Sequence, residues 1–498
     1  MSGPALGLSG LAVYLAALAL LTAAARRRRR DDSPADHFLA GRDLGVPVLF
    51  LTLYATAFSG NSLIGYPGAA YRHGFAWIMA TGFMLAITVV THALAPRLRP
   101  LAAAHGFVSP GDWVRHRFGA EPAGPAVVRA VAAVMTLALA NFLLAQLVAM
   151  GHVAAQVTAG AVPYWGGVVG LALVVLVYET LGGMRAVAWT DALQGVLMLV
   201  GLAALLAWLA GEAGGLGGMT ARVAAVRPAA VAVPDGWTCL EWASTITLVG
   251  VGAAIYPQAI QRIYAARSGR TLRRALALLA VMPLATIVVV TLAGVAAIPR
   301  HPDLGAIEAD GVMPLLLGEW AATGPAGAAL ATAVFVGALA AIMSTADSVL
   351  LALGAVIAVD LLGGDRTDPA TTRRGKRAAA ALLVVAVAAA LEPRLTLWRL
   401  TELKMELLVQ CAPAFLLALH WPRLRAAPLL AGLAVGVAIA AAPVLLGIDR
   451  LAGVHVGLLG LAANTAVAVA GSRARPAPGR GDVGNLSHGP RRAHARHG

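Results

Sequence analysis

The sequence predicts an all-α polytopic membrane protein with about thirteen transmembrane helices. Hydrophobic residues make up 59% of the 498 residues and charged residues only 12%, with a mean hydropathy of +0.77. A soluble chain of this length would carry roughly a quarter charged residues. Apolar stretches long enough to span a bilayer also recur along the whole chain. The formal net charge of +14 lies mostly in short connections and in the tail, so it indicates topology in a lipid bilayer rather than nucleic-acid binding.

Thirteen stretches have spanning length. They are 5–25, 47–66, 74–97, 126–150, 162–180, 188–211, 239–262, 275–299, 323–358, 377–392, 396–420, 427–446 and 452–471. The first lacks the basic N-terminal region of a secretory signal and is followed by five arginines, Arg26 to Arg30. Because arginines stay in the cytoplasm, we expect the N-terminus outside and the C-terminus inside, in the inner or plasma membrane.

The remaining connections test this orientation. Those predicted to be cytoplasmic are rich in basic residues, namely Arg97, Arg99, Arg115, Arg117, Arg185, Arg262, Arg267, Arg270, Arg273, Arg274, Arg366, Arg373, Arg374, Lys376, Arg377, Arg423 and Arg425. Those predicted to be outside hold single arginines or a pair. We therefore divide the chain into an extra N-terminal helix with its basic flank (1–30), two five-helix repeats (37–211 and 238–420), two C-terminal helices (427–471) and a disordered basic cytoplasmic tail (472–498).

Two of the predicted spans contain helix-breaking residues. Gly60-Asn61-Ser62 falls in the middle of the second span, and the seventh contains Val249-Gly250-Val251-Gly252 followed by Tyr256-Pro257. Unwinding at such places frees backbone carbonyls at membrane depth. The two spans are five apart, which fits a 5+5 inverted-repeat core with broken first and sixth core helices.

The ninth span carries a polar face. Ala341, Ser344 and Thr345 are spaced so that they share one side of a helix. Hydroxyls and carbonyls suit a hard cation such as sodium. The alternative is that the two hydroxyls only join neighbouring helices.

Three sequence blocks resemble the solute:sodium symporter family over about residues 37–445. They are Ser59 to Gly74, Tyr178 to Gln194 with Gly182-Gly183-Met184 and Trp189-Thr190-Asp191-Ala192-Leu193-Gln194, and Ala340 to Ser348. The resemblance implies a leucine-transporter-like fold with sodium bound between the first and eighth core helices. Its implied ligands are the carbonyls of Ala55, Phe58 and Ala341 and the hydroxyls of Ser344 and Thr345.

Other polar residues have more than one interpretation. The resemblance associates Asp191 with sodium passage on the inner side, although its Thr-Asp pair would also cap a helix. Asp347 lies deeper and needs a partner, for which Lys404 is a candidate. Ala57 stands where some family members carry an acidic residue, so one electrostatic contribution to ion binding is missing.

These features favour a sodium-coupled symporter that imports a small organic solute, such as a monocarboxylate, an amino acid or a pantothenate-like acid, by alternating access. We expect neither enzyme activity nor a cofactor apart from sodium as the coupling ion. The alternatives are a proton-coupled transporter of the same fold and a transporter-like sensor. Candidate solute contacts, chosen as polar or unwound residues near the breaks, are Gly60, Asn61, Asn141, Gln146, Tyr256 and Gln258.

Overall fold

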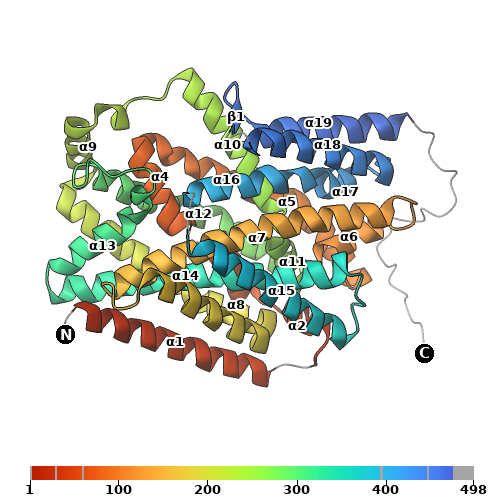
Figure 1. The fold of residues 1–498 in the computed structure, drawn as a ribbon, viewed down its shortest axis with the longest axis horizontal. Coiled ribbons are helices and arrows are strands. Elements are labelled where there is room, and N and C mark those ends of the chain that lie inside the picture. The colour runs from red at the N-terminus through yellow and green to blue at the C-terminus, as the bar shows by residue number, and fades with distance from the viewer. Residues whose placement is uncertain (1–2, 29–30, 59–60, 393–395, 446–447, 475–498) are drawn as a thin grey trace, which may run out of the picture.

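The computed structural model describes residues 3–28, 31–58, 61–392, 396–445 and 448–474, which form a helical bundle (Figure 1). Its first half contains α1 (Gly3–Arg27), α2 (Pro34–Leu39), α3 (Val46–Ala57), α4 (Tyr66–His73), α5 (Ala80–His105), α6 (Pro110–Phe118), α7 (Gly124–Val157), α8 (Tyr164–Ala213) and α9 (Gly215–Val226). The second half contains α10 (Gly236–Ala254), α11 (Pro257–Ala265), α12 (Gly269–Ala297), α13 (Val312–Ala322), α14 (Pro325–Ala355), α15 (Pro369–Ala390), α16 (Leu397–Leu408), α17 (Ala418–His420), α18 (Ala426–Leu445) and α19 (Val456–Arg473). A short hairpin of β1 (Arg450–Leu451) and β2 (Val454–His455) joins the last two helices.

The second predicted span is interrupted. Helix α3 ends at Ala57, and Phe58 is extended (φ −101°, ψ 93°). The described chain resumes at Asn61 in a π-helical turn, η2 (Asn61–Gly65), which leads into α4. Gly60, expected at the centre of this interruption, lies outside the described residues.

The seventh predicted span is also broken, but not at its glycines. Helices α10 and α11 meet at an angle of 49°, with Ile255 and Tyr256 between them. Pro257 explains the position, because proline lacks an N–H and pushes the preceding residue out of the helical region. Gly250 stays inside α10, where an added Cβ would lie 2.4 Å from the Cβ of Ala86. The glycine therefore permits close packing of α10 on α5 rather than a break.

Spans five and six are joined without a loop. Helix α8 consists of two helical segments, before and after a kink at Gly183, whose backbone is non-helical (φ 56°, ψ −157°). A Cβ on Gly183 would lie 2.5 Å from Nδ1 of His37 and 2.6 Å from its carbonyl oxygen. Both the positive φ and this close approach of the chain require glycine there.

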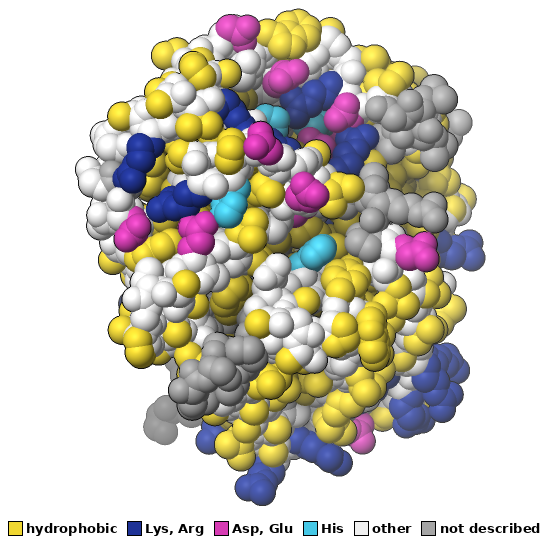
Figure 2. All heavy atoms as spheres, turned by 60° about the vertical axis from the view of Figure 1, so that its left-hand side comes forward, with side chains coloured by type: hydrophobic (Ala, Val, Ile, Leu, Met, Phe, Trp, Pro, Cys, Tyr) yellow, Lys and Arg dark blue, Asp and Glu magenta, His cyan; other side chains and the backbone are white. Residues whose placement is uncertain are grey.

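In the described residues, eight helices are long and apolar enough to cross a membrane, or nine if the bent pair α10–α11 is one span. In this total, the segments Ser62–His105 and Tyr164–Glu212 are each counted as one span. A straight helix of 49 residues would be about 74 Å long, which is far more than one crossing requires. The thirteen-span count and the repeat boundaries stay predictions. On the face drawn in Figure 2, hydrophobic side chains are widespread, and charged side chains gather in the upper part and along the lower edge.

The ends of the bundle agree with the predicted arrangement of connections. Helices α9 and α13 lie at the same end as the start of α1, whereas α2 and α6 lie at the opposite end (Figure 1). The centre is occupied by α14, whose residues from Gly337 to Ala355 are all buried. It contacts α3, α7, α8 and α11, so both broken spans meet it.

Candidate functional site

The predicted sodium ligands lie on two helices in contact, α3 and α14. Ala341, Ser344 and Thr345 are completely buried, and the Thr345 hydroxyl donates to the Ala341 carbonyl over 3.2 Å. Ala55 belongs to the last turn of α3, where carbonyls lack partners within the helix. Phe58 follows that turn in extended conformation, so its carbonyl points out of the helical ladder. The proposed ligands therefore come from the buried face of α14 and from the end of α3, two helices in contact.

A carboxylate joins this group from α8. The hydroxyl of Ser344 donates to Asp191, and the hydroxyl of Thr52 donates to the second oxygen of the same carboxylate. The guanidinium of Arg262 also binds Asp191, with Nη2 2.9 Å from Oδ2. All these side chains have no solvent exposure. Asp191 thus lies in direct contact with one of the predicted sodium ligands.

Arg262 corrects the sequence analysis, which placed it in a cytoplasmic connection. It lies in the last turn of α11 and is completely buried. Its Nε donates to Thr52 Oγ1 over 2.8 Å, and its Nη2 donates to Ser348 Oγ over 2.6 Å. The sequence signal was the Pro257 break, because the half-helix that follows such a break can continue inside the protein.

Asp347 also corrects the sequence analysis. Its oxygens accept hydrogen bonds from Tyr178 over 2.5 Å and from Ser348 over 3.2 Å. The expected ion pair with Lys404 does not form, because the Lys404 ammonium lies 3.3 Å from the centre of the Phe142 ring instead.

These contacts define a cluster with unequal charges. The cluster contains the two carboxylates of Asp191 and Asp347 and, within the described part of the chain, the guanidinium of Arg262. At full ionisation it carries one excess negative charge. Either protonation of one carboxylate or a monovalent cation held by the neighbouring hydroxyls and carbonyls would balance this charge.

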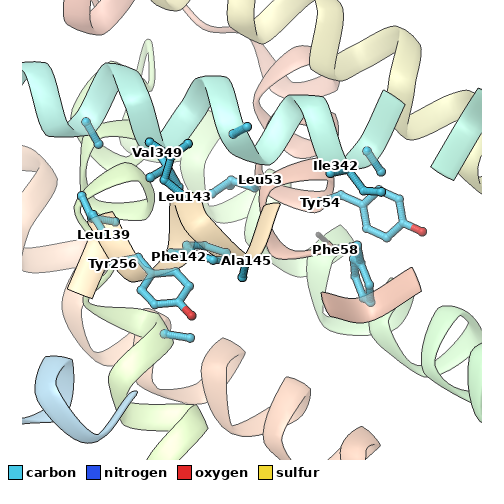
Figure 3. Packing of buried hydrophobic residues seen from close by; sticks show 14 of the residues in the cluster. Leu53, Tyr54, Phe58, Leu139, Phe142, Leu143, Ala145, Tyr256, Ile342 and Val349 are labelled. Atoms are coloured by element: carbon cyan, nitrogen blue, oxygen red, sulfur yellow. The ribbon is translucent and has the colours of Figure 1, made fainter. Parts of the chain in front are cut away.

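A cavity of about 70 Å³ lies between the two broken spans. Its walls come from α3, η2, α4, α5, α7, α10, α11, α12 and α16. The wall residues are Leu53, Thr56, Ala57, Ser62, Tyr66, Met84, Ile87, Thr91, Phe142, Val249, Ala253, Tyr256, Ala259, Leu279, Thr401, Lys404 and Met405. Phe142 and Tyr256 face each other with ring centres 5.4 Å apart (Figure 3). This space is far smaller than the roughly 300–1,000 Å³ of typical ligand pockets, so a solute is small or the helices part to admit it.

Aromatic rings close one side of the cavity. Tyr66 lines it and makes edge contacts with Trp77, Phe83 and Trp398, at ring separations of 5.9, 5.6 and 5.7 Å. Trp77 and Trp398 are 4.7 Å apart. Tyr66 comes from α4, Trp77 from η3 (Gly74–Met79), Phe83 from α5 and Trp398 from α16. The four rings therefore form a lid that joins four elements.

The predicted solute contacts are distributed unevenly. Tyr256 lines the cavity, whereas Asn141, Gln146 and Gln258 are not among its described wall residues. Gly60 and the side chain of Asn61 lie outside what the structure describes. The sequence analysis missed Thr56, Ser62, Tyr66 and Thr401 as wall residues and misassigned Lys404. The only sequence signal for these wall residues would have been which side of α3 and α16 they occupy relative to the two helix breaks.

Two half-helix breaks beside a cavity and a buried oxygen-rich cluster define a membrane secondary transporter. The family model of the sodium:solute symporter family matches residues 37–436. The chain therefore belongs to the sodium:solute symporter family, as its sequence blocks predicted.

Individual relatives agree with this assignment. The chain is 28% identical over 423 residues to the high-affinity proline transporter PutP of Bacillus subtilis (strain 168), which covers 81% of this chain and 85% of PutP. It is 30% identical over 172 residues to the sodium/pantothenate symporter of Escherichia coli (strain K12), and that alignment spans only 34% of each chain. A solved Na⁺-coupled sialic acid symporter, in a substrate-bound outward-open state, superposes with a TM-score of 0.75 over 95% of this chain and 98% of its own, at 18% identity. The last comparison confirms the leucine-transporter-like fold.

Proposed function

We propose that this protein is a sodium-coupled symporter that moves a small organic solute across the cell membrane by alternating access. The proposal is supported chiefly by the Ser344–Asp191 contact, in which a buried carboxylate lies against the hydroxyl face of α14 and also accepts a hydrogen bond from Thr52 of α3. Sodium would bind the carbonyls of Ala55, Phe58 and Ala341 and the hydroxyls of Ser344 and Thr345. The Ser344 oxygen would bind the ion through a lone pair, while its O–H continues to donate to Asp191.

Helix α3 provides the coupling between ion and solute. Its last turn carries proposed sodium ligands, and the same turn contributes Thr56 and Ala57 to the cavity wall. An ion that orders this turn also shapes the cavity, so each ligand increases the affinity for the other. Movement of the lid formed by Tyr66, Trp77, Phe83 and Trp398 would open one side, and rearrangement around Asp191 and Arg262 would open the other.

The hydroxyl groups of α14 argue against the proton-coupled alternative. A proton-coupled transporter would need a titrating group in place of the hydroxyl ligands, whereas Ser344 and Thr345 are both present and buried.

We place the N-terminus outside and the C-terminus in the cytoplasm on the basis of the arginine distribution. Relatives named for proline and pantothenate support a small solute of that kind for this chain.

The test is uptake by purified protein in proteoliposomes. A panel of radiolabelled short acids, amino acids and pantothenate is offered with an inward gradient of sodium, with the same gradient of choline, and with a proton gradient alone. We expect one solute to accumulate only with sodium. Equal accumulation in choline with a proton gradient would favour the proton-coupled alternative and contradict the proposal.

A further inference from the structure

Lys404 is a buried lysine that faces the cavity. Its side chain is 2% exposed and forms part of the cavity wall on α16. Its Nζ lies 3.3 Å from the ring centre of Phe142 and 5.0 Å from that of Tyr256. No described residue forms a hydrogen bond or an ion pair with this ammonium. The two aromatic faces offset part of the cost of burying the charge, but they leave its donors without acceptors.

The other described wall residues determine what this ammonium can bind. None of them is acidic, and Ala57 stands where an acidic side chain would have projected from α3. The polar wall groups are hydroxyls, from Thr56, Ser62 and Thr401 among others, and the rest of the surface is apolar. A cationic or zwitterionic solute would therefore bring a positive charge that finds no carboxylate in the wall.

Charge balance across the two neighbouring sites points to an anion. With all three groups ionised, the cluster of Asp191, Asp347 and Arg262 carries one excess negative charge, and a protonated Lys404 gives the described cavity wall one positive charge. Sodium neutralises the first site, and an anion with one negative charge neutralises the second.

From this geometry we infer that the transported solute is a small monocarboxylate with an apolar body, whose carboxylate is bound by the ammonium of Lys404. The inference rests on the proposed symport and narrows its solute class. The carboxylate accepts hydrogen bonds from Nζ and from the neighbouring hydroxyls, and the aliphatic part packs against Phe142 and Tyr256. Lys404 therefore selects charge, while the size of the cavity limits chain length.

The test compares matched acids and amides binding to purified full-length protein. Propanoate and propanamide, butanoate and butanamide, and L-alanine are titrated in sodium chloride and in choline chloride, with thermal unfolding and direct binding as readouts. We expect the acids to bind at least tenfold more tightly than their amides in sodium, and L-alanine to bind more weakly than propanoate.

Variants then assign the preference to one residue. Lys404→Gln should weaken acid binding by roughly 10- to 100-fold and leave amide binding unchanged, because it removes a charge-assisted hydrogen bond. Lys404→Arg keeps the charge and should keep the preference for acids, which also covers the case in which Lys404→Gln does not fold. The matched control is Lys376→Gln, which alters the chain's other lysine, at the start of α15, and should bind like the wild type.

The outcomes separate this inference from the proposed function. Equal binding of acids and amides, tighter binding of L-alanine than of propanoate, or an unchanged acid preference in Lys404→Gln would overturn the inference. Acid binding that depends on Lys404 but is the same in sodium and in choline would support the inference and contradict sodium coupling.

Discussion

Removing single hydroxyls from α14 is expected to weaken sodium binding without unfolding the protein. In Ser344→Ala the ion loses one ligand, and Asp191 loses one of its buried donors. In Thr345→Ala the ion loses a second ligand, together with the hydroxyl that donates to the Ala341 carbonyl. Loss of one buried polar contact costs about 1–3 kcal/mol. At about 1.4 kcal/mol per factor of ten, half-saturating sodium should rise by roughly 5- to 150-fold in each variant.

The assay is sodium-dependent solute uptake in proteoliposomes, measured over a sodium series for each variant. Thr136→Ala is the matched control, because the Thr136 hydroxyl in α7 donates to the carbonyl four residues earlier just as Thr345 does in α14. Thermal unfolding without sodium shows whether each variant is folded. Sodium dependence equal to that of Thr136→Ala in both α14 variants would refute the assignment of these hydroxyls as ligands.

Three further predictions address the charge cluster, the helix packing and the topology. Asp191→Asn and Arg262→Gln should each lower the free energy of unfolding by about 3–5 kcal/mol, because each leaves a buried charge without its partner. The double variant should lose less stability than the sum of the two single losses. Gly294→Ala should destabilise the protein by about 1–3 kcal/mol, because its Cβ would lie 2.1 Å from the carbonyl oxygen of Pro67 and force α12 away from α4. Single cysteines are introduced at the exposed positions 305 and 373 in a background without the two native cysteines. An impermeant reagent should label position 305 in intact cells and position 373 only after lysis.

Thermal unfolding in detergent measures the first two, and labelling of intact and lysed cells measures the third. Gly170→Ala is the control for packing, because nothing lies within 4 Å of its added Cβ, so it should leave stability unchanged or slightly raised. Additive losses in the double variant would mean that Asp191 and Arg262 are not coupled. An unchanged Gly294→Ala, or labelling of position 373 in intact cells, would contradict the helix packing or the thirteen-span topology.

The fold class followed from composition because lipid leaves few architectures open to a chain of this kind. The break at Tyr256-Pro257 was predictable, since proline acts locally on the residue before it. Gly250 was misleading, because a glycine inside a membrane helix serves close packing as readily as unwinding. The local sequence does not distinguish close packing from unwinding, because the outcome depends on which residue of the neighbouring helix lies opposite the glycine.

The polar contacts were harder to predict than the helices. Ser344 and Thr345 were proposed as ligands from their shared helical face, which is a local property, and this assignment stays a prediction. The partners of Arg262, Asp347 and Lys404 depend on how helices far apart in sequence pack together. An arginine near a predicted helix end is normally assigned to the aqueous boundary, and only the continuation of α11 beyond the break places Arg262 in the core.

Entry of ²²Na⁺ together with solute is the most direct test of sodium-coupled symport. Proteoliposomes containing the purified protein are given ²²Na⁺ outside at equal internal sodium concentration, with and without an inward gradient of the solute identified in the uptake panel. We expect the solute gradient to drive additional ²²Na⁺ entry in the wild type, and Ser344→Ala to show that entry only at higher sodium. Solute entry with no additional ²²Na⁺, accompanied instead by acidification of the vesicle interior, would contradict sodium coupling.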